Sequence, residues 1–227
     1  MIRNDGTEKY TTAFFKPTNE KLNIIFLDWD GVMVTGRNAD SCRKAYEKGR
    51  DKIVEVLGEQ AKNLEPNMIG SVLMFSPVAV AHLKTLIQTF DAKIVLSNGS
   101  RYNDRERSRR EIGLMFKLWE LDRHLIDSTP WMSNDKTKEI SAWLEENKAI
   151  VNNFVILDDC DFGFSSLFPD HFVEINGSQL LEERDIEKAK SIFSIKRDLE
   201  RSSVTMLSQL VDSQRVDDVI LSHNQVS

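Results

Sequence analysis

Two aspartates separated by a single residue, Asp28 and Asp30, are the side chains of this chain best suited to do chemistry. An aspartate has an unperturbed pKa near about 3.9, so Asp28 can attack phosphorus as an anion without a base to activate it. Asp30 could then move the proton that the leaving group requires. The pair predicts phosphoryl transfer, although the same residues also suit a helix cap or a calcium-binding loop.

The residues before these aspartates predict a buried strand. Residues 22–27 form an apolar run apart from Asn23, which suits a parallel sheet covered on both faces better than a one-sided antiparallel strand. Asp28 then lies at the carboxyl end of the strand, where ligands bind in open α/β sheets. Asp30 and Gly31 supply a turn that lets both acids face one crevice.

A second apolar run, residues 93–97, ends in the hydroxyl side chain of Ser97 and continues into Asn98. A serine where a strand leads into a helix offers one anion an O–H donor, free backbone N–H groups and the positive end of the helix dipole. Ser97 is therefore a candidate phosphate ligand, and Asn98 is a candidate substrate contact. Helix capping is the plainer alternative for Ser97.

A third apolar run, residues 154–157, ends in Asp158 and Asp159. Mg²⁺ prefers oxygen ligands and is commonly held by one or two carboxylates together with phosphate and water. Asp158 is the better candidate for a direct metal ligand. Asp159 is expected to complete the metal site by orienting a metal-bound water or a lysine. A surface turn of acidic residues is the alternative.

The negative charge of these acids predicts a lysine nearby. Several carboxylates and a phosphate dianion would crowd one pocket unless cations offset them. Lys136 follows helix-start signals at residues 133–135 and could reach the pocket from the first helical turn. Lys138 is the alternative, and a solvated helix lysine is the ordinary outcome for either residue.

The order of these segments resembles the four motifs of the haloacid dehalogenase (HAD) superfamily of phosphohydrolases. The segments read FLDWDGV, KIVLSNGSR, NDKTKEISAWLEEN and FVILDD. The resemblance covers about residues 22–190 and extends to the small HAD domains of RNA-repair proteins and of some bacterial effector phosphatases.

The resemblance implies a role for each motif residue. It makes Asp28 the nucleophile and Asp30 the general acid and base. Ser97 would bind the phosphoryl oxygens, and Lys136 would stabilise the charges of nucleophile and phosphate. The implied cofactor is Mg²⁺, held by Asp28, the backbone carbonyl of Asp30 and Asp158.

The positions of the motifs predict the organisation of the chain. The resemblance implies an α/β fold, a Rossmann-like parallel sheet of about five strands flanked by helices, over residues 21–195. The residues after the first strand, 37–75, are expected to form a small helical cap that leaves the pocket mouth open. A polar arm is expected at residues 1–20 and a helical tail at residues 196–227.

Two further side chains bear on the substrate. Trp29 lies between the two acids, and an open pocket would let its ring face an aromatic leaving group. Arg101 begins a run of arginines spaced four apart, with Arg105 and Arg109, which could steer an acidic substrate or simply pair with acids on a solvated helix. By likeness to the effector phosphatases, we expect a phosphoprotein substrate, specifically phosphotyrosine. A nucleic-acid end, a small metabolite and a non-catalytic binding module are the alternatives.

The composition is that of an ordinary globular protein. Apolar residues make up 41% and charged residues 29% of the 227-residue chain, and no apolar run reaches the roughly 18 residues of a membrane span. A formal net charge of −6 disfavours general affinity for nucleic acid. Cys42 and Cys160 lie far apart, so we expect no disulfide and a reducing, cytoplasmic location. No signal peptide opens the chain, and export as an effector without a cleavable signal is the alternative.

Overall fold

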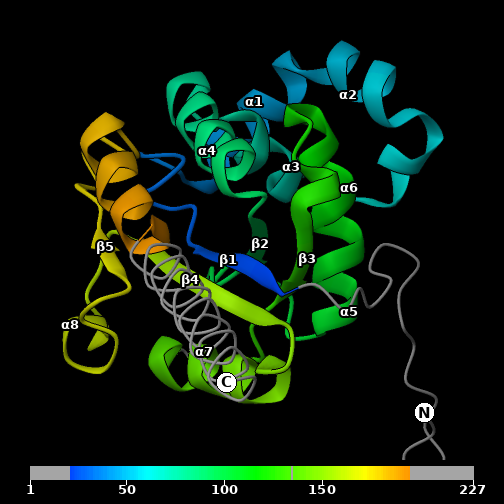
Figure 1. The fold of residues 1–227 in the computed structure, drawn as a ribbon. Helices are drawn as coiled ribbons and strands as arrows, with labels where there is room; N and C mark the ends of the chain where they lie inside the picture. The colour runs from blue at the N-terminus through cyan, green and yellow to red at the C-terminus, as the bar shows by residue number, and fades with distance from the viewer. Residues whose placement is uncertain (1–20, 134, 195–227) are drawn as a thin grey trace, which may run out of the picture.

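The structure is a computed structural model that describes residues 21–133 and 135–194. A parallel sheet of five strands runs through these residues in the order β3-β2-β1-β4-β5, with helices on both faces (Figure 1). The predicted α/β fold with five parallel strands is confirmed. The arm and the tail expected at residues 1–20 and 196–227 lie outside the described residues. The strands are β1 (Leu22–Leu27), β2 (Lys93–Leu96), β3 (Leu125–Ser128), β4 (Val151–Asp158) and β5 (Phe172–Glu174).

The central strand β1 is buried on both faces, as its largely apolar sequence predicts. Ile25 and Leu27 belong to one hydrophobic core, and Ile24 and Phe26 belong to the other. All four side chains are fully buried. Alternation along the strand therefore anchors β1 from both sides and fixes the direction in which its last residues leave the sheet.

Helices cover the two faces of the sheet separately, and Figure 1 shows α4 and α7 on opposite sides of it. The first core includes residues of α4 (Pro77–Phe90), α6 (Gly113–Phe116) and the helical residues 183–194. The second core includes residues of α7 (Lys136–Asn147) and α8 (Phe164–Leu167).

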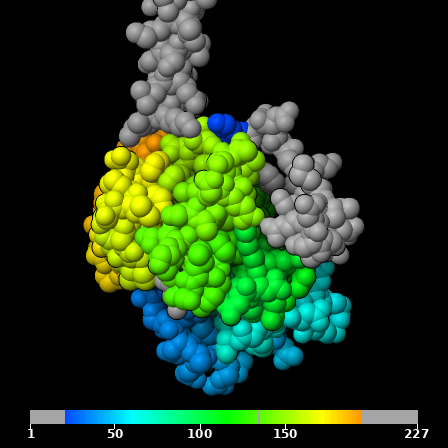
Figure 2. Space-filling view, turned by 90° about the horizontal axis from the view of Figure 1, so that it is seen from below, coloured from blue at the N-terminus to red at the C-terminus, as the bar shows by residue number. Residues whose placement is uncertain are grey.

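The segment between β1 and α4 is helical. It contains α1 (Ala39–Lys48), α2 (Arg50–Leu57), the 3₁₀ helix η1 (Gly58–Asn63) and α3 (Pro66–Leu73). We call these four helices the insert. In Figure 2 the insert, coloured blue to cyan, forms one end of the molecule. At Gly70 a Cβ atom would lie 2.0 Å from the backbone oxygen of Cys42, so α1 and α3 can approach this closely only with glycine there.

The chain after β2 departs from the expected arginine-bearing helix. Helix α5 (Arg105–Arg107) begins four residues after Arg101 and runs into a π-helical turn, η2 (Ser108–Ile112). Arg101 therefore lies in a loop, and the wider turn breaks the spacing of four residues beyond Arg105. The 3₁₀ helices η3 (Lys117–Trp119) and η4 (Asp122–His124) then lead to β3.

Within the described ranges, no single helix is long and apolar enough to cross a membrane. Helices α3 and α4 reach the required length and composition only when taken together, and the chain bends by 81° between them.

Candidate active site

Three neighbouring strands end at the same edge of the sheet and bring their polar residues together. Asp28 follows β1, Ser97 follows β2, and Asp158 ends β4. The backbone N–H of Ser97 donates to the carbonyl of Leu27 at 3.0 Å, and that of Asp28 donates to the carbonyl of Leu157 at 3.0 Å. These bonds extend the parallel ladders past the strand ends, so the three tips lie side by side.

Lys136 joins two of these tips through one ammonium group. Its Nζ donates to Oδ2 of Asp158 at 2.6 Å and lies 3.3 Å from Oδ2 of Asp28. The position follows from the helix start, because Asp135 caps α7 and makes Lys136 the first helical residue. Lys138 is exposed and pairs with Asp135 at 2.7 Å. Of the two candidate lysines, Lys136 is the one that lies at the carboxylates.

The pKa shifts of Asp28, Asp158 and Lys136 indicate that the negative charge of this cluster is not fully neutralised. Burial raises the pKa of Asp28, against the opposing charge of Lys136. Burial and the neighbouring charge of Asp28 raise the pKa of Asp158 to about 7. Burial alone would lower the pKa of Lys136, but the charges of Asp28 and Asp158 outweigh it and the pKa is raised. One ammonium group therefore serves two buried carboxylates without neutralising both.

Asn98 holds the two aspartates of the first motif. Its Nδ2 donates to Oδ1 of Asp28 at 2.6 Å and to Oδ2 of Asp30 at 3.3 Å. With Lys136 on the other oxygen of Asp28, the carboxylate is fixed in orientation. The side-chain amide of Asn98, predicted to contact substrate, is thus engaged with the carboxylates.

Ser97 has an unpaired hydroxyl group at the same edge of the sheet. Its Oγ is buried and has no hydrogen-bond partner among the described residues. A buried hydroxyl without a partner costs about 1–3 kcal/mol. A ligand that accepts a hydrogen bond, such as a phosphoryl oxygen, would satisfy it.

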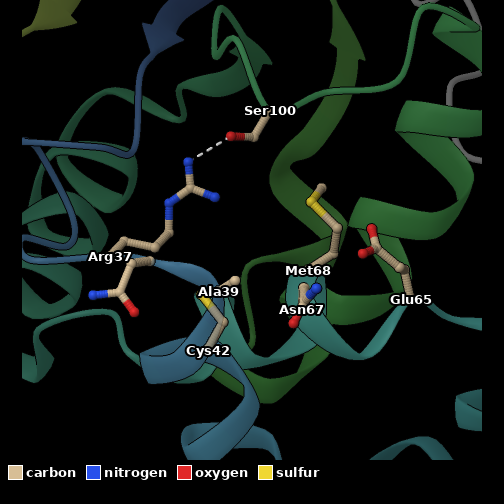
Figure 3. Close-up of a pocket in the computed structure, with 8 residues that line it drawn as sticks. Arg37, Ala39, Cys42, Glu65, Asn67, Met68 and Ser100 are labelled. Atoms are coloured by element: carbon tan, nitrogen blue, oxygen red, sulfur yellow. Dashed lines mark hydrogen bonds between the residues drawn. The ribbon is translucent and has the colours of Figure 1, made fainter.

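Asp30 is held by Arg37, a residue that the sequence analysis does not single out. Nε and Nη2 of Arg37 each donate to one carboxylate oxygen of Asp30, both at 2.5 Å. Nη2 also donates to Oγ of Ser100 at 2.6 Å (Figure 3). Arg37 lies just before α1, so the chain that leads into the insert contacts the first motif through this side chain.

The prediction that Trp29 faces a substrate ring is wrong. Trp29 is fully buried, and its ring lies 5.8 Å from that of Phe75 and 6.3 Å from that of Phe116. Successive side chains of an extended chain point to opposite sides. Asp28 and Asp30 therefore face the site, and Trp29 turns into the core between them.

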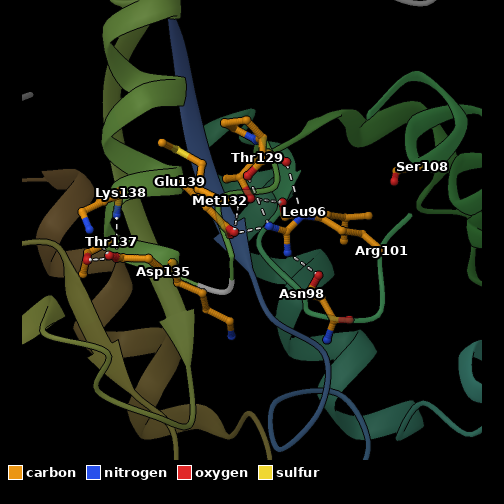
Figure 4. A network of polar contacts seen from close by, with 12 residues as sticks. Leu96, Asn98, Arg101, Ser108, Thr129, Met132, Asp135, Thr137, Lys138 and Glu139 are labelled. Carbon is orange, nitrogen blue, oxygen red and sulfur yellow. Dashed lines mark hydrogen bonds and ion pairs between the residues drawn. The ribbon is translucent and has the colours of Figure 1, made fainter. Parts of the chain in front are cut away.

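The prediction that Arg101 binds or steers substrate is also wrong. Its side chain is only 2% exposed and forms an ion pair with the fully buried Glu139. Arg101 donates to the carbonyls of Asn98 and Thr129, and Glu139 accepts from the backbone N–H of Met132 at 2.8 Å (Figure 4). The pair thereby ties the loop after β2 to the helix that carries the site lysine. Burial lowers the pKa of Arg101, against the charge of Glu139.

Asp159 lies beside the site, against two glycines. A Cβ atom on Gly31 would come within 2.0 Å of its Oδ2, and one on Gly177 within 2.7 Å. The backbone of Gly31 also has φ +71°, which favours glycine. The glycine of the first motif thus makes room for this acid. The site lysine donates to Asp158 rather than to Asp159.

Phe162 is a second residue that sequence reasoning missed. It is 45% exposed, and its ring centroid lies 4.6 Å from Nζ of Lys136. An exposed aromatic ring beside a buried ammonium group marks the mouth of the site. Its only signal in the sequence is its position shortly after the acidic pair.

The residues at this edge fit a divalent cation. Asp28 and Asp158 are buried carboxylates that share one ammonium group. The carboxylate of Asp159 and the thiol of Cys160 each place a ligand atom within 4.8 Å of that of Asp158. Carboxylate oxygens are the ligands that Mg²⁺ prefers.

Comparison with known protein families decides the classification. A family model described as the HAD domain in Swiss Army Knife RNA repair proteins matches residues 24–186. The chain belongs to this family. The HAD match runs from β1 into the last described helix and includes every site residue above. It confirms the resemblance to HAD domains of RNA-repair proteins and supports a hydrolase of the phosphatase type. Searches of curated proteins and of solved structures found no match.

Proposed function

We propose that this protein is a magnesium-dependent phosphatase that cleaves phosphate monoesters through an aspartyl-phosphate on Asp28. The observation that carries the proposal is the arrangement around this carboxylate. Asn98 and Lys136 each hold one of its oxygens, and the unpaired hydroxyl of Ser97 lies at the neighbouring strand tip. An oriented anion beside an ammonium group is what attack on a phosphate dianion requires.

The first half of the reaction transfers the phosphoryl group to the enzyme. A carboxylate oxygen of Asp28 attacks phosphorus, and the bond between phosphorus and the leaving-group oxygen breaks. A proton on Asp30 passes to that oxygen, so the leaving group departs as an alcohol. Lys136 and Ser97 stabilise the negative charge on the phosphoryl oxygens.

The second half returns the enzyme to its starting state. Asp30 accepts a proton from a water molecule as that water attacks phosphorus. The bond between phosphorus and Asp28 breaks, which releases inorganic phosphate and restores both side chains. When bound at Asp28 and Asp158, Mg²⁺ supplies the positive charge that lets a phosphate dianion approach these acids.

For the substrate, we propose the terminal phosphate of a nucleic acid. The family description names RNA-repair proteins, and the support that Trp29 lent to phosphotyrosine is lost because that ring is buried. The formal net charge of −6 opposes binding along a polynucleotide. We therefore expect recognition of an end rather than of a long stretch of strand.

Phosphotyrosine is the second candidate, because the exposed ring of Phe162 is compatible with an aromatic leaving group. This ring lies close enough to Lys136 to contact an aromatic leaving group. A nucleobase and a tyrosine ring would both suit such a contact.

A substrate panel with and without Mg²⁺ tests the proposal. It includes 3′-phosphorylated and 5′-phosphorylated oligonucleotides, a phosphotyrosine peptide, a sugar phosphate and an aryl phosphate. We expect turnover only with Mg²⁺, highest on an oligonucleotide end, and none by Asp28→Asn. Failure of the wild type on every substrate, or unchanged turnover by Asp28→Asn, would contradict the proposed chemistry. A preference for the phosphotyrosine peptide would replace the substrate assignment.

A further inference from the structure

Two exposed aromatic rings lie in the loops that border the candidate active site. The large apolar side chains exposed in the described ranges include Trp131, at 38% exposure, and Phe162, at 45%. Trp131 belongs to the loop between β3 and α7, and Phe162 belongs to the loop between β4 and α8. Because β3, β4 and β1 are parallel, both loops leave the sheet at the edge where Asp28 lies.

Each of these rings rests on a cation close to Asp28. Nζ of Lys136 lies 4.6 Å from the ring centroid of Phe162, and Cζ of Arg101 lies 5.4 Å from that of Trp131. Both cations are themselves held by ion pairs with fully buried carboxylates. A cation within about 6 Å of a ring centroid attracts the ring. Each ring is therefore fixed against a charged group while more than a third of its side chain stays exposed.

The backbone on both sides of Trp131 is also held in place. The carbonyl of Pro130 accepts from Nη2 of Arg101 at 3.4 Å. The backbone N–H of Met132 donates to Glu139 at 2.8 Å (Figure 4). A side chain that is already held in position loses little conformational freedom when a ligand binds to it, and this favours affinity.

The loop that carries Phe162 is packed in the same way. The ring of Phe162 meets that of the buried Phe164 at a centroid distance of 6.0 Å. A Cβ atom on Gly163 would lie 3.7 Å from Cγ2 of Thr137, so the backbone of this loop contacts the first turn of α7. Both rings are thus positioned by the helix that supplies the site lysine.

The net charge of the chain bears on how it could hold a polynucleotide. Proteins that bind along a nucleic-acid backbone neutralise its phosphates with lysines and arginines, whereas the formal net charge here is −6. Stacking of a base on an aromatic ring needs no neutralised phosphate, and it suits any base because every base has a flat face. Two exposed rings beside a phosphate site therefore fit a strand that is held by its end.

We propose that Phe162 and Trp131 stack on the last two nucleobases of a single-stranded polynucleotide whose end phosphate enters the active site. This inference rests on the proposed function and names the part of the substrate, beyond the phosphate, that the protein recognises. Phe162 takes the terminal base, since its ring lies beside the site lysine, and Trp131 takes the next. Bases paired in a duplex already stack on one another, so the preferred end is unpaired.

The first test compares two probes of equal length and charge in their binding to Asp28→Asn with Mg²⁺. One is a hexa-adenylate with a phosphate at both ends, and the other is the matching abasic chain. We expect the hexa-adenylate to bind at least about tenfold more tightly, as stacked bases allow. Equal binding of the two probes by calorimetry would overturn the proposal. Equal binding of a blunt duplex with the same end phosphates would overturn it as well.

The dependence of hexa-adenylate binding on salt gives a second readout. With only one or two phosphates held, the logarithm of the affinity should fall with that of the salt concentration at a slope between about −0.7 and −1.4. A slope steeper than about −3 would overturn the proposal, because the backbone rather than the bases would then hold the strand.

Substitutions of the rings assign the contacts. Trp131→Ala and Phe162→Ala, each added to Asp28→Asn, should weaken hexa-adenylate binding by about tenfold and leave binding of the abasic chain unchanged. Trp131→Phe keeps a ring and should restore most of the affinity. Val54→Ala, at an exposed apolar position of α2, is the matched control and should change neither probe. Thermal melting shows which variants fold.

Equal losses on both probes would show that the rings only support the loops, and would overturn the proposal. Unchanged binding of hexa-adenylate in both ring variants would overturn it too. A phosphotyrosine peptide is the third probe, and ring-dependent binding of this peptide alone would overturn the polynucleotide as occupant.

Turnover by the wild type separates this inference from the proposed chemistry. Ribose 5-phosphate, which has no base, reports the chemistry without the stacking contacts. Its turnover together with ring-independent binding of hexa-adenylate would overturn the inference and leave the phosphatase proposal standing. Ring-dependent binding would uphold the inference even if the wild type turns over no phosphate ester.

Discussion

Nζ of Lys136 lies 2.6 Å from Oδ2 of Asp158, and it is also 3.3 Å from Oδ2 of Asp28. One ammonium group thus joins the tips of two strands that are distant in sequence but adjacent in the sheet. Because both acids are buried, we expect this contact to govern the charge of the site, its affinity for a cation and its reactivity.

Replacing Lys136 by glutamine is expected to lower kcat by about 100-fold or more, because one preorganised donor to the phosphoryl group is lost. Without Mg²⁺, the free energy of unfolding should also fall by about 3–5 kcal/mol, since two buried acids lose the ammonium group that they share. Steady-state kinetics and urea unfolding in chelator measure the two effects.

Lys138→Gln is the matched control for this experiment, since Lys138 lies on the same helix and is exposed. It should change the free energy of unfolding by less than about 0.5 kcal/mol and leave kcat unchanged. Equal effects of the two substitutions would contradict the role of Lys136 in stabilising the buried carboxylates and the phosphoryl group.

The affinity for Mg²⁺ is expected to depend on pH through Asp158. The pKa of this acid is raised to about 7 without metal, and a metal ion binds the ionised carboxylate. Protons therefore compete with Mg²⁺ below pH 7 and cease to compete above it. Calorimetry should show affinity falling about fivefold as the pH drops from about 7 to about 6, with proton release on binding. Asp158→Asn should lose most of the affinity, and a flat profile in the wild type would refute this account.

The buried pair of Arg101 and Glu139 is expected to matter for stability. Glu139→Ala leaves a buried guanidinium group and the backbone N–H of Met132 without their carboxylate partner, which should cost about 3–5 kcal/mol. Urea unfolding measures this cost. Adding Arg101→Met should recover part of it, because the unpaired charge is then gone.

Glu145→Ala, which breaks an exposed pair with Lys148 on the surface, is the control and should change the free energy of unfolding by less than about 0.5 kcal/mol. A loss at Glu139 no larger than this would show that the buried pair contributes little.

Trp29 and Phe162 are expected to behave in opposite ways. Trp29→Phe should lower the free energy of unfolding by about 1 kcal/mol, as a core substitution, and leave unchanged the ratio of kcat/KM for an aryl phosphate to that for an alkyl phosphate. Phe162→Leu should leave stability nearly unchanged and lower that ratio. If Trp29→Phe changes this ratio, the ring of Trp29 contacts the substrate, which would contradict the conclusion drawn from its burial.

Much of the fold follows from the sequence because the strands are buried on both faces. The observed bounds of β1, Leu22–Leu27, are those predicted, since its run of residues is apolar apart from Asn23 and ends at a charged residue. The same logic places Asp28 and Asp158 at neighbouring tips. The choice of Lys136 over Lys138 depends on the direction in which the first turn of α7 faces, which a single sequence leaves open.

The errors have physical causes as well. The expectation for Trp29 rests on its proximity to the two acids along the chain, whereas alternation along an extended segment turns its side chain away from those of Asp28 and Asp30. The spacing of the arginines predicts a helix through Arg101, whereas the helix starts only at Arg105. Its burial depends on Glu139, a contact across 38 residues that no local pattern reveals. Arg37 escaped notice for the same reason, because the insert must fold before it can meet Asp30.

The most direct test of the central claim is to trap the phosphoryl group on Asp28. The protein, with Mg²⁺ and an excess of the best substrate, is quenched in acid within milliseconds, digested and analysed by mass spectrometry. The account predicts that the peptide containing Asp28 gains the mass of one phosphoryl group, that hydroxylamine removes it, and that Asp28→Asn shows no gain. Rapid turnover with no phosphorylated peptide at any quench time, or with the phosphoryl group on another residue, would contradict it.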